Sequence, residues 1–163
     1  MAPISAVVVV ASNRAADGVY EDTSGPVLVD ELASRGFNVA GPVVVHDGDE
    51  VEQALRDAVD DGYDLVITSG GTGLTSKDLT PEMTRRVIDR EVPGIAEAIR
   101  AAGAAKTPLA ALSRGLAGAK GKTLIVNIAG STGAAKDALE VLSSELIDHA
   151  VSQLHDGDHG RSD

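Results

Sequence analysis

Three short runs made mostly of aliphatic residues constrain the fold of this chain more than any other feature. They cover residues 6–11, 65–68 and 123–128; the first contains four consecutive valines, and the other two include only Thr68, Thr123 and Asn127 as polar residues. A strand with one solvated face alternates polar and apolar residues, whereas a strand covered on both faces is apolar throughout. The runs therefore predict central strands of a parallel sheet that is buried on both sides.

Helix-like segments separate these runs. In residues 51–59 the apolar side chains recur at i, i+3, i+4, i+7 and i+8, which is one face of an amphipathic helix. Asp49, with Glu52 three residues later, predicts the N-terminal cap of this helix. Further helices are expected over residues 24–36, from residue 80, over 95–102 and from 133 to 150. Two further strands are expected, one over residues 37–45 with a bend at Gly41-Pro42, and a short one over residues 109–112.

This alternation of strands and helices predicts an α/β fold. The expected architecture has three α-β-α layers, a mostly parallel central sheet and a Rossmann-like topology. A chain of 163 residues fits one domain with a sizeable core. The domain is expected to span residues 1–154, and the polar residues 155–163 are expected to fray.

The composition argues against several classes of function. The chain has no Cys, which excludes disulfides, thiolate metal sites and cysteine nucleophiles. It has no Trp, one Phe and two Tyr, and its net charge is −11, so a nucleic-acid or anionic membrane surface is not expected. No apolar run is long enough to span a membrane and no basic leader is seen, so a cytoplasmic protein is expected.

Polar loops are expected to gather at one edge of the sheet, because ligands of parallel sheets bind at the carboxyl ends of the strands. Four loops are predicted there, at residues 12–23, 46–49, 69–80 and 130–133. The third combines three glycines with several hydroxyl groups, a lysine and an aspartate. Glycine lets backbone amides approach a phosphate closely, so this loop predicts a phosphate or nucleotide site. A long structured turn would use the same glycines.

The two best-known phosphate-binding motifs do not fit the chain. Gly71-Thr72-Gly73 would need glycine at position 76 to complete the dinucleotide fingerprint, and that residue is Ser76. Gly121-Lys122-Thr123 looks like the end of a Walker loop, but the glycine required five positions earlier is Leu116.

Two carboxylates are candidates for chemistry. Asp78 lies in the glycine-rich loop, and Asp47 follows the strand expected over residues 37–45, at the same edge of the sheet. Because Asp49 is expected to cap the next helix, Asp47 is free for another role. Two carboxylates at this place would either bind Mg²⁺ between phosphates or orient a nucleophile. The turn over residues 130–133 is either an anion site or an ordinary helix cap.

The ordered motifs of the chain resemble those of the MogA/MoaB family of molybdenum-cofactor biosynthesis, from residue 6 to residue 154. The most specific match is the run from Ser69 to Gly73, followed by Lys77-Asp78 and by Thr80-Pro81-Glu82. Further matches are Ser12-Asn13-Arg14, Asp22-Thr23-Ser24-Gly25-Pro26, Asp47, Pro93-Gly94, Leu112-Ser113-Arg114 and Gly130-Ser131.

The resemblance implies a molybdopterin adenylyltransferase, which transfers AMP from ATP to molybdopterin, releases pyrophosphate and requires Mg²⁺. It implies that Asp47 and Asp78 are both catalytic and metal-binding, that the chain forms a homotrimer or a hexamer, and that other cofactor-synthesis proteins are partners. The positions that match the family's nucleotide- and pterin-binding residues are Ser12, Ser69, Gly70, Gly71, Thr72, Gly73, Lys77, Thr80, Pro81, Glu82, Ser113, Arg114, Gly130 and Ser131.

Three positions depart from the family pattern. Asn13 stands where Asp is usual, His46 stands where Pro is common, and residues 128–133 lack the two prolines of the usual turn. These changes are expected to remove one carboxylate and to loosen two loops. The alternative function is therefore a molybdopterin-binding paralog, a carrier or adaptor with little or no turnover.

Overall fold

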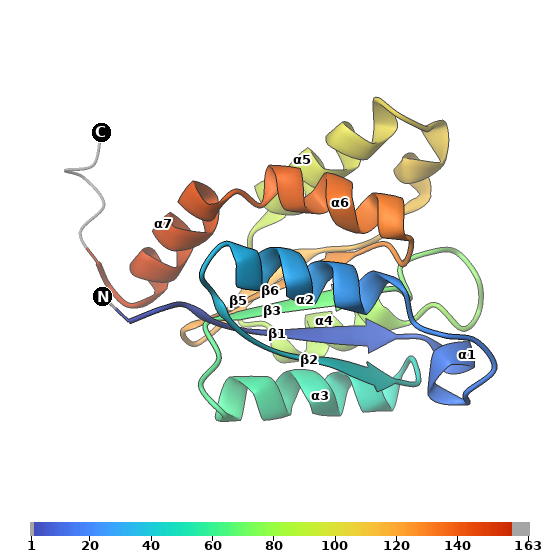
Figure 1. Ribbon diagram of the computed structural model, residues 1–163, viewed down its shortest axis with the longest axis horizontal. Coiled ribbons are helices and arrows are strands. Elements are labelled where there is room, and N and C mark those ends of the chain that lie inside the picture. The colour runs from blue at the N-terminus through green and yellow to red at the C-terminus, as the bar shows by residue number, and fades with distance from the viewer. Residues whose placement is uncertain (1, 158–163) are drawn as a thin grey trace.

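The three predicted apolar runs form central strands of one six-stranded sheet in the computed structural model, which describes residues 2–157 (Figure 1). The elements are β1 (Ser5–Ala11), α1 (Asn13–Ala16), α2 (Ser24–Ser34), β2 (Asn38–Val45), α3 (Asp49–Asp60), β3 (Leu65–Ser69), α4 (Thr80–Val87), β4 (Arg90–Glu91), α5 (Pro93–Ala104), the 3-10 helix η1 (Pro108–Leu112), β5 (Ala117–Lys120), β6 (Thr123–Ile128), α6 (Thr132–Val141) and α7 (Ser144–Leu154).

The sheet has the order β2-β1-β3-β6-β5-β4, and its first four strands are parallel. Val8 on β1 pairs with Ile67 on β3, which in turn pairs with Val126 on β6, so one row of fully buried aliphatic side chains crosses the sheet. The expected bend in β2 is present: the pairing with β1 shifts between Val7 and Val9, beside the cis Gly41-Pro42 bond.

Helices cover both faces of the sheet, as Figure 1 shows, with α2 and α6 on one side and α3 on the other. Leu28 and Leu32 of α2 are fully buried in one core with the side chains of α6 and α7. Val51 and Leu55 of α3 are fully buried in a second core, which α4 joins. Burying one such side chain stabilises the fold by about 1.5–3 kcal/mol. The predicted three-layer α/β fold is thus confirmed.

Three predicted details are wrong. Residues 109–112 form η1 rather than a strand, because Pro108 and the cap on Thr107 favour a tight helical turn. The single last helix is two helices, since Ser143 caps a new start at α7. Asp49 is the first residue of α3, and the N-cap is Gly48, whose positive φ of 103° suits glycine.

The carboxyl ends of the parallel strands all lie at one edge of the sheet, on the right of Figure 1, with α1 and the loop that follows β3. At the opposite edge His155, which follows α7, contacts Asp64 with 3.0 Å between Nε2 and Oδ1. Of the tail predicted to fray, residues 158–163 lie outside the described residues. No helix within residues 2–157 combines the length and the apolar character needed to cross a membrane.

Candidate functional site

The four predicted polar loops meet at the carboxyl edge of the sheet and surround two adjoining hollows. One, here called the glycine hollow, has a volume of about 400 Å³ and is lined by Ser69 to Gly73 together with Ser12, Asp78 and Gly130. The other, the carboxylate hollow, has a volume of about 470 Å³ and includes Asp47 and Lys77. Ser12, Gly71 and Asp78 line both, so the two hollows share a wall.

Backbone geometry explains why glycines form this wall. Gly70 and Gly71 have φ values of 97° and 69°, which residues with side chains rarely adopt. A Cβ on Gly71 would overlap both the Asp47 carboxylate and the Thr80 hydroxyl. Glycine at position 71 therefore lets the loop after β3 pass directly against the loop after β2.

Asp47 joins these two loops through hydrogen bonds. Its Oδ1 accepts from the Gly48 amide at 2.8 Å and from the Thr80 hydroxyl at 2.9 Å, and its Oδ2 accepts from the Leu79 amide at 2.9 Å. The sequence prediction that Asp47 is free for other work is therefore wrong in part, because both of its oxygens hold the start of α4.

Asp78 is less committed than Asp47. Its Oδ2 accepts hydrogen bonds from the amide and the hydroxyl of Thr75, at 3.0 and 2.8 Å. Its Oδ1 has no hydrogen-bond partner among residues 2–157. Asp78 thus offers one open carboxylate oxygen at the wall between the two hollows.

Arg114 holds the glycine-rich loop in place through hydrogen bonds to its backbone. Its Nε donates to the carbonyl of Gly73 at 2.8 Å, and its Nη2 donates to the carbonyl of Asp78 at 2.9 Å. Its guanidinium also forms a two-point ion pair with Glu82, at 2.6 and 3.2 Å. This contact lowers the pKa of the Glu82 carboxyl and raises the pKa of Arg114. Arg114 and Glu82 therefore hold the shape of the loop, and neither lines the two hollows.

The other predicted residues of the loop divide into exposed and buried ones. Lys77 is exposed and lines the carboxylate hollow. Ser69 is fully buried, with its hydroxyl 2.9 Å from that of Ser24. Thr80 and Pro81 are buried at the start of α4 and line neither hollow.

Two residues that depart from the family pattern, Asn13 and His46, contact the loop around Asp47. The Oδ1 of Asn13 accepts a hydrogen bond of 3.0 Å from the Asp47 amide. The ring of His46 lies between two carboxylates, with Nε2 2.6 Å from Asp17 and Nδ1 3.0 Å from Glu50. These contacts raise the pKa of His46. The loop around Asp47 therefore has contacts on both sides, from Asn13 and through His46.

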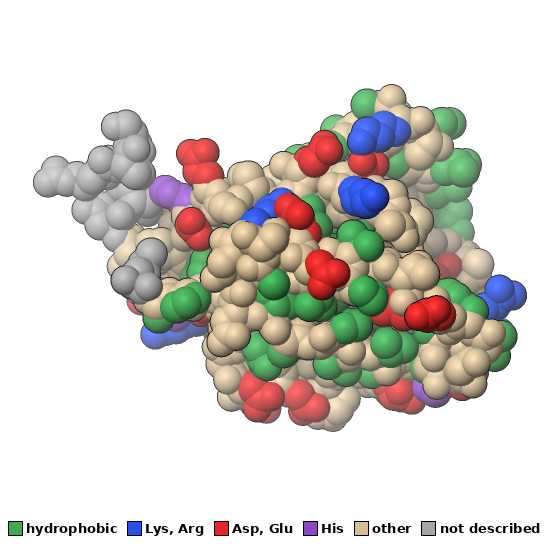
Figure 2. All heavy atoms as spheres, viewed as in Figure 1, with side chains coloured by type: hydrophobic (Ala, Val, Ile, Leu, Met, Phe, Trp, Pro, Cys, Tyr) green, Lys and Arg blue, Asp and Glu red, His purple; other side chains and the backbone are tan. Residues whose placement is uncertain are grey.

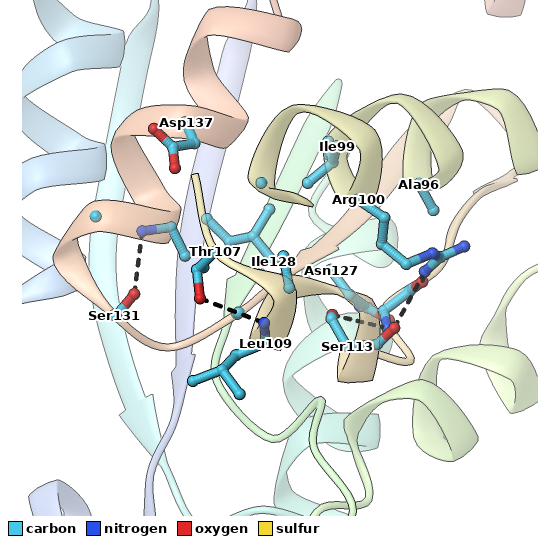
Figure 3. Close-up of a pocket in the computed structure, with 16 residues that line it drawn as sticks. Ala96, Ile99, Arg100, Thr107, Leu109, Ser113, Asn127, Ile128, Ser131 and Asp137 are labelled. Atoms are coloured by element: carbon cyan, nitrogen blue, oxygen red, sulfur yellow. Dashed lines mark hydrogen bonds between the residues drawn. The ribbon is translucent and has the colours of Figure 1, made fainter. Parts of the chain in front are cut away.

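A third cavity of about 370 Å³ lies beside the two hollows, between α5, η1 and the start of α6 (Figure 3). Ile99, Leu109 and Ile128 give it apolar walls. Ser113 and Ser131, two of the predicted residues, line this cavity, whereas Gly130 lines the glycine hollow. We call it the α5–α6 cavity.

The turn before α6 keeps its shape without prolines. Ser131 caps α6, and its hydroxyl oxygen accepts a hydrogen bond of 3.0 Å from the Ala134 amide. A side chain on Gly130 would press on Gly70, so the two glycine turns pack closely. The cap prediction for this turn is confirmed, and its role as an anion site stays a prediction.

The positive charge available to an anionic ligand comes from a few groups that line the hollows. Figure 2 shows acidic side chains spread over the visible face, with no continuous basic patch on it. The cations that line the carboxylate hollow are Lys77 and Arg14, and the glycine hollow offers an anionic substrate the backbone amides of its glycines. Within residues 2–157 no three His, Asp or Glu side chains are grouped so that they could hold a metal ion by themselves.

The sequence prediction missed several residues that line these spaces. Tyr20 lies at the glycine hollow, with its hydroxyl 3.1 Å from that of Ser12. Arg100, Asn127 and Asp137 line the α5–α6 cavity. Arg100 and Asp137 are single residues of amphipathic helices and Asn127 lies in an apolar strand, so no local motif marks them.

Comparison with known proteins agrees with this geometry. The family model described as "Probable molybdopterin binding domain" matches residues 7–149. The "Molybdopterin adenylyltransferase" of Helicobacter pylori strain J99 is 37% identical over 136 residues, which cover 81% of this chain and 77% of that protein. The Drosophila melanogaster "Molybdenum cofactor synthesis protein cinnamon" is 38% identical over 139 residues, 83% of this chain but only 23% of the longer relative.

The fold comparison leads to the same family. A solved structure titled "anomalous substructure of MogA" superposes with a TM-score of 0.89 at 49% identity, covering 92% of this chain and 99% of the other. Fold, glycine wall and sequence therefore agree, and the chain belongs to the MogA/MoaB family of molybdopterin-binding domains.

Proposed function

We propose that this chain is a molybdopterin adenylyltransferase. In the reaction, an oxygen of the terminal phosphate of molybdopterin attacks the α-phosphorus of ATP. A new P–O bond forms, the bond to the bridging oxygen of the β-phosphate breaks, and pyrophosphate leaves. The curated relative from H. pylori, at 37% identity, carries this activity in its name.

One observation carries the proposal: Asp78, whose Oδ1 has no hydrogen-bond partner within residues 2–157, lines both hollows. We assign the phosphates of ATP to these hollows, where the glycine amides and Lys77 meet their charge. We assign molybdopterin to the α5–α6 cavity. Ser113 lines this cavity and lies next in the chain to Arg114, which contacts the glycine-rich loop after β3. The backbone amide of Arg114, the next residue, donates to the Thr72 carbonyl at 2.8 Å, so the two substrates would meet beside Asp78.

Asp78 has a carboxylate oxygen available for a Mg²⁺ ion that takes its other ligands from phosphates and water, which is the usual mode for this ion. Asp47 lines the same hollow and would have to share an oxygen that already accepts a hydrogen bond. When bound, Mg²⁺ would neutralise the phosphate charge that shifts during transfer. The residues of the chain supply position: Asp47 holds the start of α4, Arg114 holds the loop, and the rigid glycine wall orients the nucleotide. Transfer of this kind depends mainly on such positioning and electrostatics.

We further propose that residues 1–154 act as one domain, as a cytoplasmic homotrimer or hexamer that works with other cofactor-synthesis proteins. A subunit interface would cover large apolar side chains that are exposed in the single chain, such as Leu74 and Leu112. Light scattering at working concentrations would measure the assembly, and a monomer would contradict this part of the proposal.

The deciding experiment mixes the purified protein with molybdopterin, ATP and Mg²⁺. We expect adenylyl-molybdopterin and pyrophosphate in equal amounts. No product, under conditions where the H. pylori enzyme turns over, would refute the proposed activity. Saturable molybdopterin binding without pyrophosphate release would instead support the carrier or adaptor alternative.

A further inference from the structure

A carboxylate, Asp137, lines the α5–α6 cavity. Asp137 lies on α6, its side chain is 19% exposed, and its Oδ1 forms an ion pair with Lys106. Its Oδ2 has no partner among the residues that the structure describes. The cavity therefore presents a fixed carboxylate with one open oxygen.

The surroundings of Asp137 suit a flat ring. The side chains of Ile99, Leu109 and Ile128 provide apolar walls, and the cavity volume of about 370 Å³ lies in the range of small-molecule sites. Figure 3 shows Asp137 at one side of the cavity and Ser113, with Arg100, at the other. A ring in this cavity would have one edge at Asp137 and its opposite end toward Ser113.

The chemistry of the ring determines which edge faces Asp137. The pyrimidine part of a pterin is a 2-amino-4-oxo ring, whose amino group and neighbouring ring N–H are two adjacent donors. A carboxylate accepts two such donors side by side, through the open Oδ2 and a remaining lone pair of Oδ1. Adenine presents one amino group beside an unprotonated nitrogen, and that nitrogen would face the carboxylate unfavourably.

We propose that Asp137 recognises the 2-amino-4-oxo edge of the pterin ring and thereby directs molybdopterin, rather than ATP, into the α5–α6 cavity. This inference rests on the proposed function, which it deepens by naming the residue that selects the ring. The orientation leaves the phosphate-bearing end of molybdopterin on the Ser113 side. That side adjoins the loop of Asp78, because Arg114 donates to the Asp78 carbonyl.

The test measures binding of free pterin and of lumazine, in which a carbonyl replaces the 2-amino group, by fluorescence titration. We expect the unaltered protein to bind pterin about tenfold or more tightly than lumazine. Asp137→Asn should lose that preference, because an amide offers a donor where the carboxylate accepts. The KM for molybdopterin in the adenylylation assay should rise by a similar factor, with the KM for ATP unchanged.

Two matched variants separate recognition from a structural role. Lys106→Met breaks the ion pair but keeps the carboxylate, and Glu140→Gln removes an exposed charge on the same helix. Both should keep the preference for pterin. A merely structural ion pair would instead make Lys106→Met and Asp137→Asn alike in melting temperature and in ligand preference, and that result would overturn the proposal.

The outcomes distinguish this inference from the proposed function. If the unaltered protein adenylylates molybdopterin but Asp137→Asn still prefers pterin to lumazine, the inference fails and the activity stands. If pterin preference depends on Asp137 but no adenylyl product forms, the proposed activity fails alone. Guanosine monophosphate carries the same donor edge, so tighter binding of it than of pterin would reassign the cavity to guanine and overturn the proposal.

Discussion

The hydroxyl of Thr80 donates a 2.9 Å hydrogen bond to the carboxylate of Asp47, and this bond joins the loop after β2 to the first residue of α4. With the Leu79 amide on its other oxygen, Asp47 determines where α4 begins. The nearby Asp78 accepts hydrogen bonds only from Thr75 of its own loop, and its other oxygen has no partner within residues 2–157. The two carboxylates therefore have different hydrogen-bonding roles, although the sequence motifs predict the same catalytic and metal-binding role for both.

We expect Asp47→Asn to reduce both stability and activity. An asparagine would place an NH₂ group against at least one of the donors that Asp47 now accepts, the Gly48 or Leu79 amide or the Thr80 hydroxyl. Leaving a donor unsatisfied in a partly buried site costs about 1–3 kcal/mol. Urea unfolding would measure this loss, with Asp30→Asn on α2 as the exposed control. A variant as stable as the control would show that these bonds do not hold α4.

We expect Asp78→Asn to lower turnover strongly while leaving stability within about 0.5 kcal/mol of the unaltered protein. The asparagine oxygen can still accept both bonds from Thr75, but the open carboxylate oxygen becomes an amide. Pyrophosphate release should fall by roughly 100-fold or more, as when one electrostatic group of a transfer site is removed. Retained turnover would mean that Asp78 is not catalytic.

Sequence reasoning predicted the parts of this protein that local pattern determines. The apolar runs gave β1, β3 and β6, and the glycine-rich motif identified the wall of the site. The strands β4 and β5 were missed because strands of two and four residues carry no measurable period. The apolar residues 109–112 were assigned to a strand because so short a run does not distinguish strand from helix.

The roles of individual side chains were harder to predict, because they depend on contacts between distant segments. Arg114 was expected among the nucleotide- and pterin-binding residues, and the structure shows its guanidinium bonded to the loop and to Glu82, contacts that no local motif predicts. Asp137 gave no signal, since one acidic residue on an amphipathic helix is ordinary. Its relevance appears only when α5 and η1 enclose it in a cavity.

We expect Gly71→Ala to destabilise the protein by about 1–3 kcal/mol or more and to abolish activity. The backbone at position 71 has a positive φ, which is strained for alanine, and the added methyl group would overlap the Asp47 carboxylate. Gly133→Ala is the matched control, because Gly133 lies in α6 and nothing lies within 4 Å of the added Cβ. That variant should be neutral or up to about 1 kcal/mol more stable, since alanine favours helix. Equal stability of the two variants would contradict the close approach of the loops.

We expect the ion pair between Glu82 and Arg114 to make stability depend on acid pH. The contact lowers the pKa of Glu82 in the folded protein below the ordinary value of 4.5, so the folded state binds its proton less readily than the unfolded state. The contribution is fully present above pH 4.5 and is lost as the pH falls through the lowered pKa. Urea unfolding from pH 7 to pH 3 should therefore show Glu82→Gln less stable than the unaltered protein at pH 7, with the difference shrinking toward pH 3. Glu97→Gln on α5 is the exposed control, and a difference that stays constant with pH would exclude the ion pair as its source.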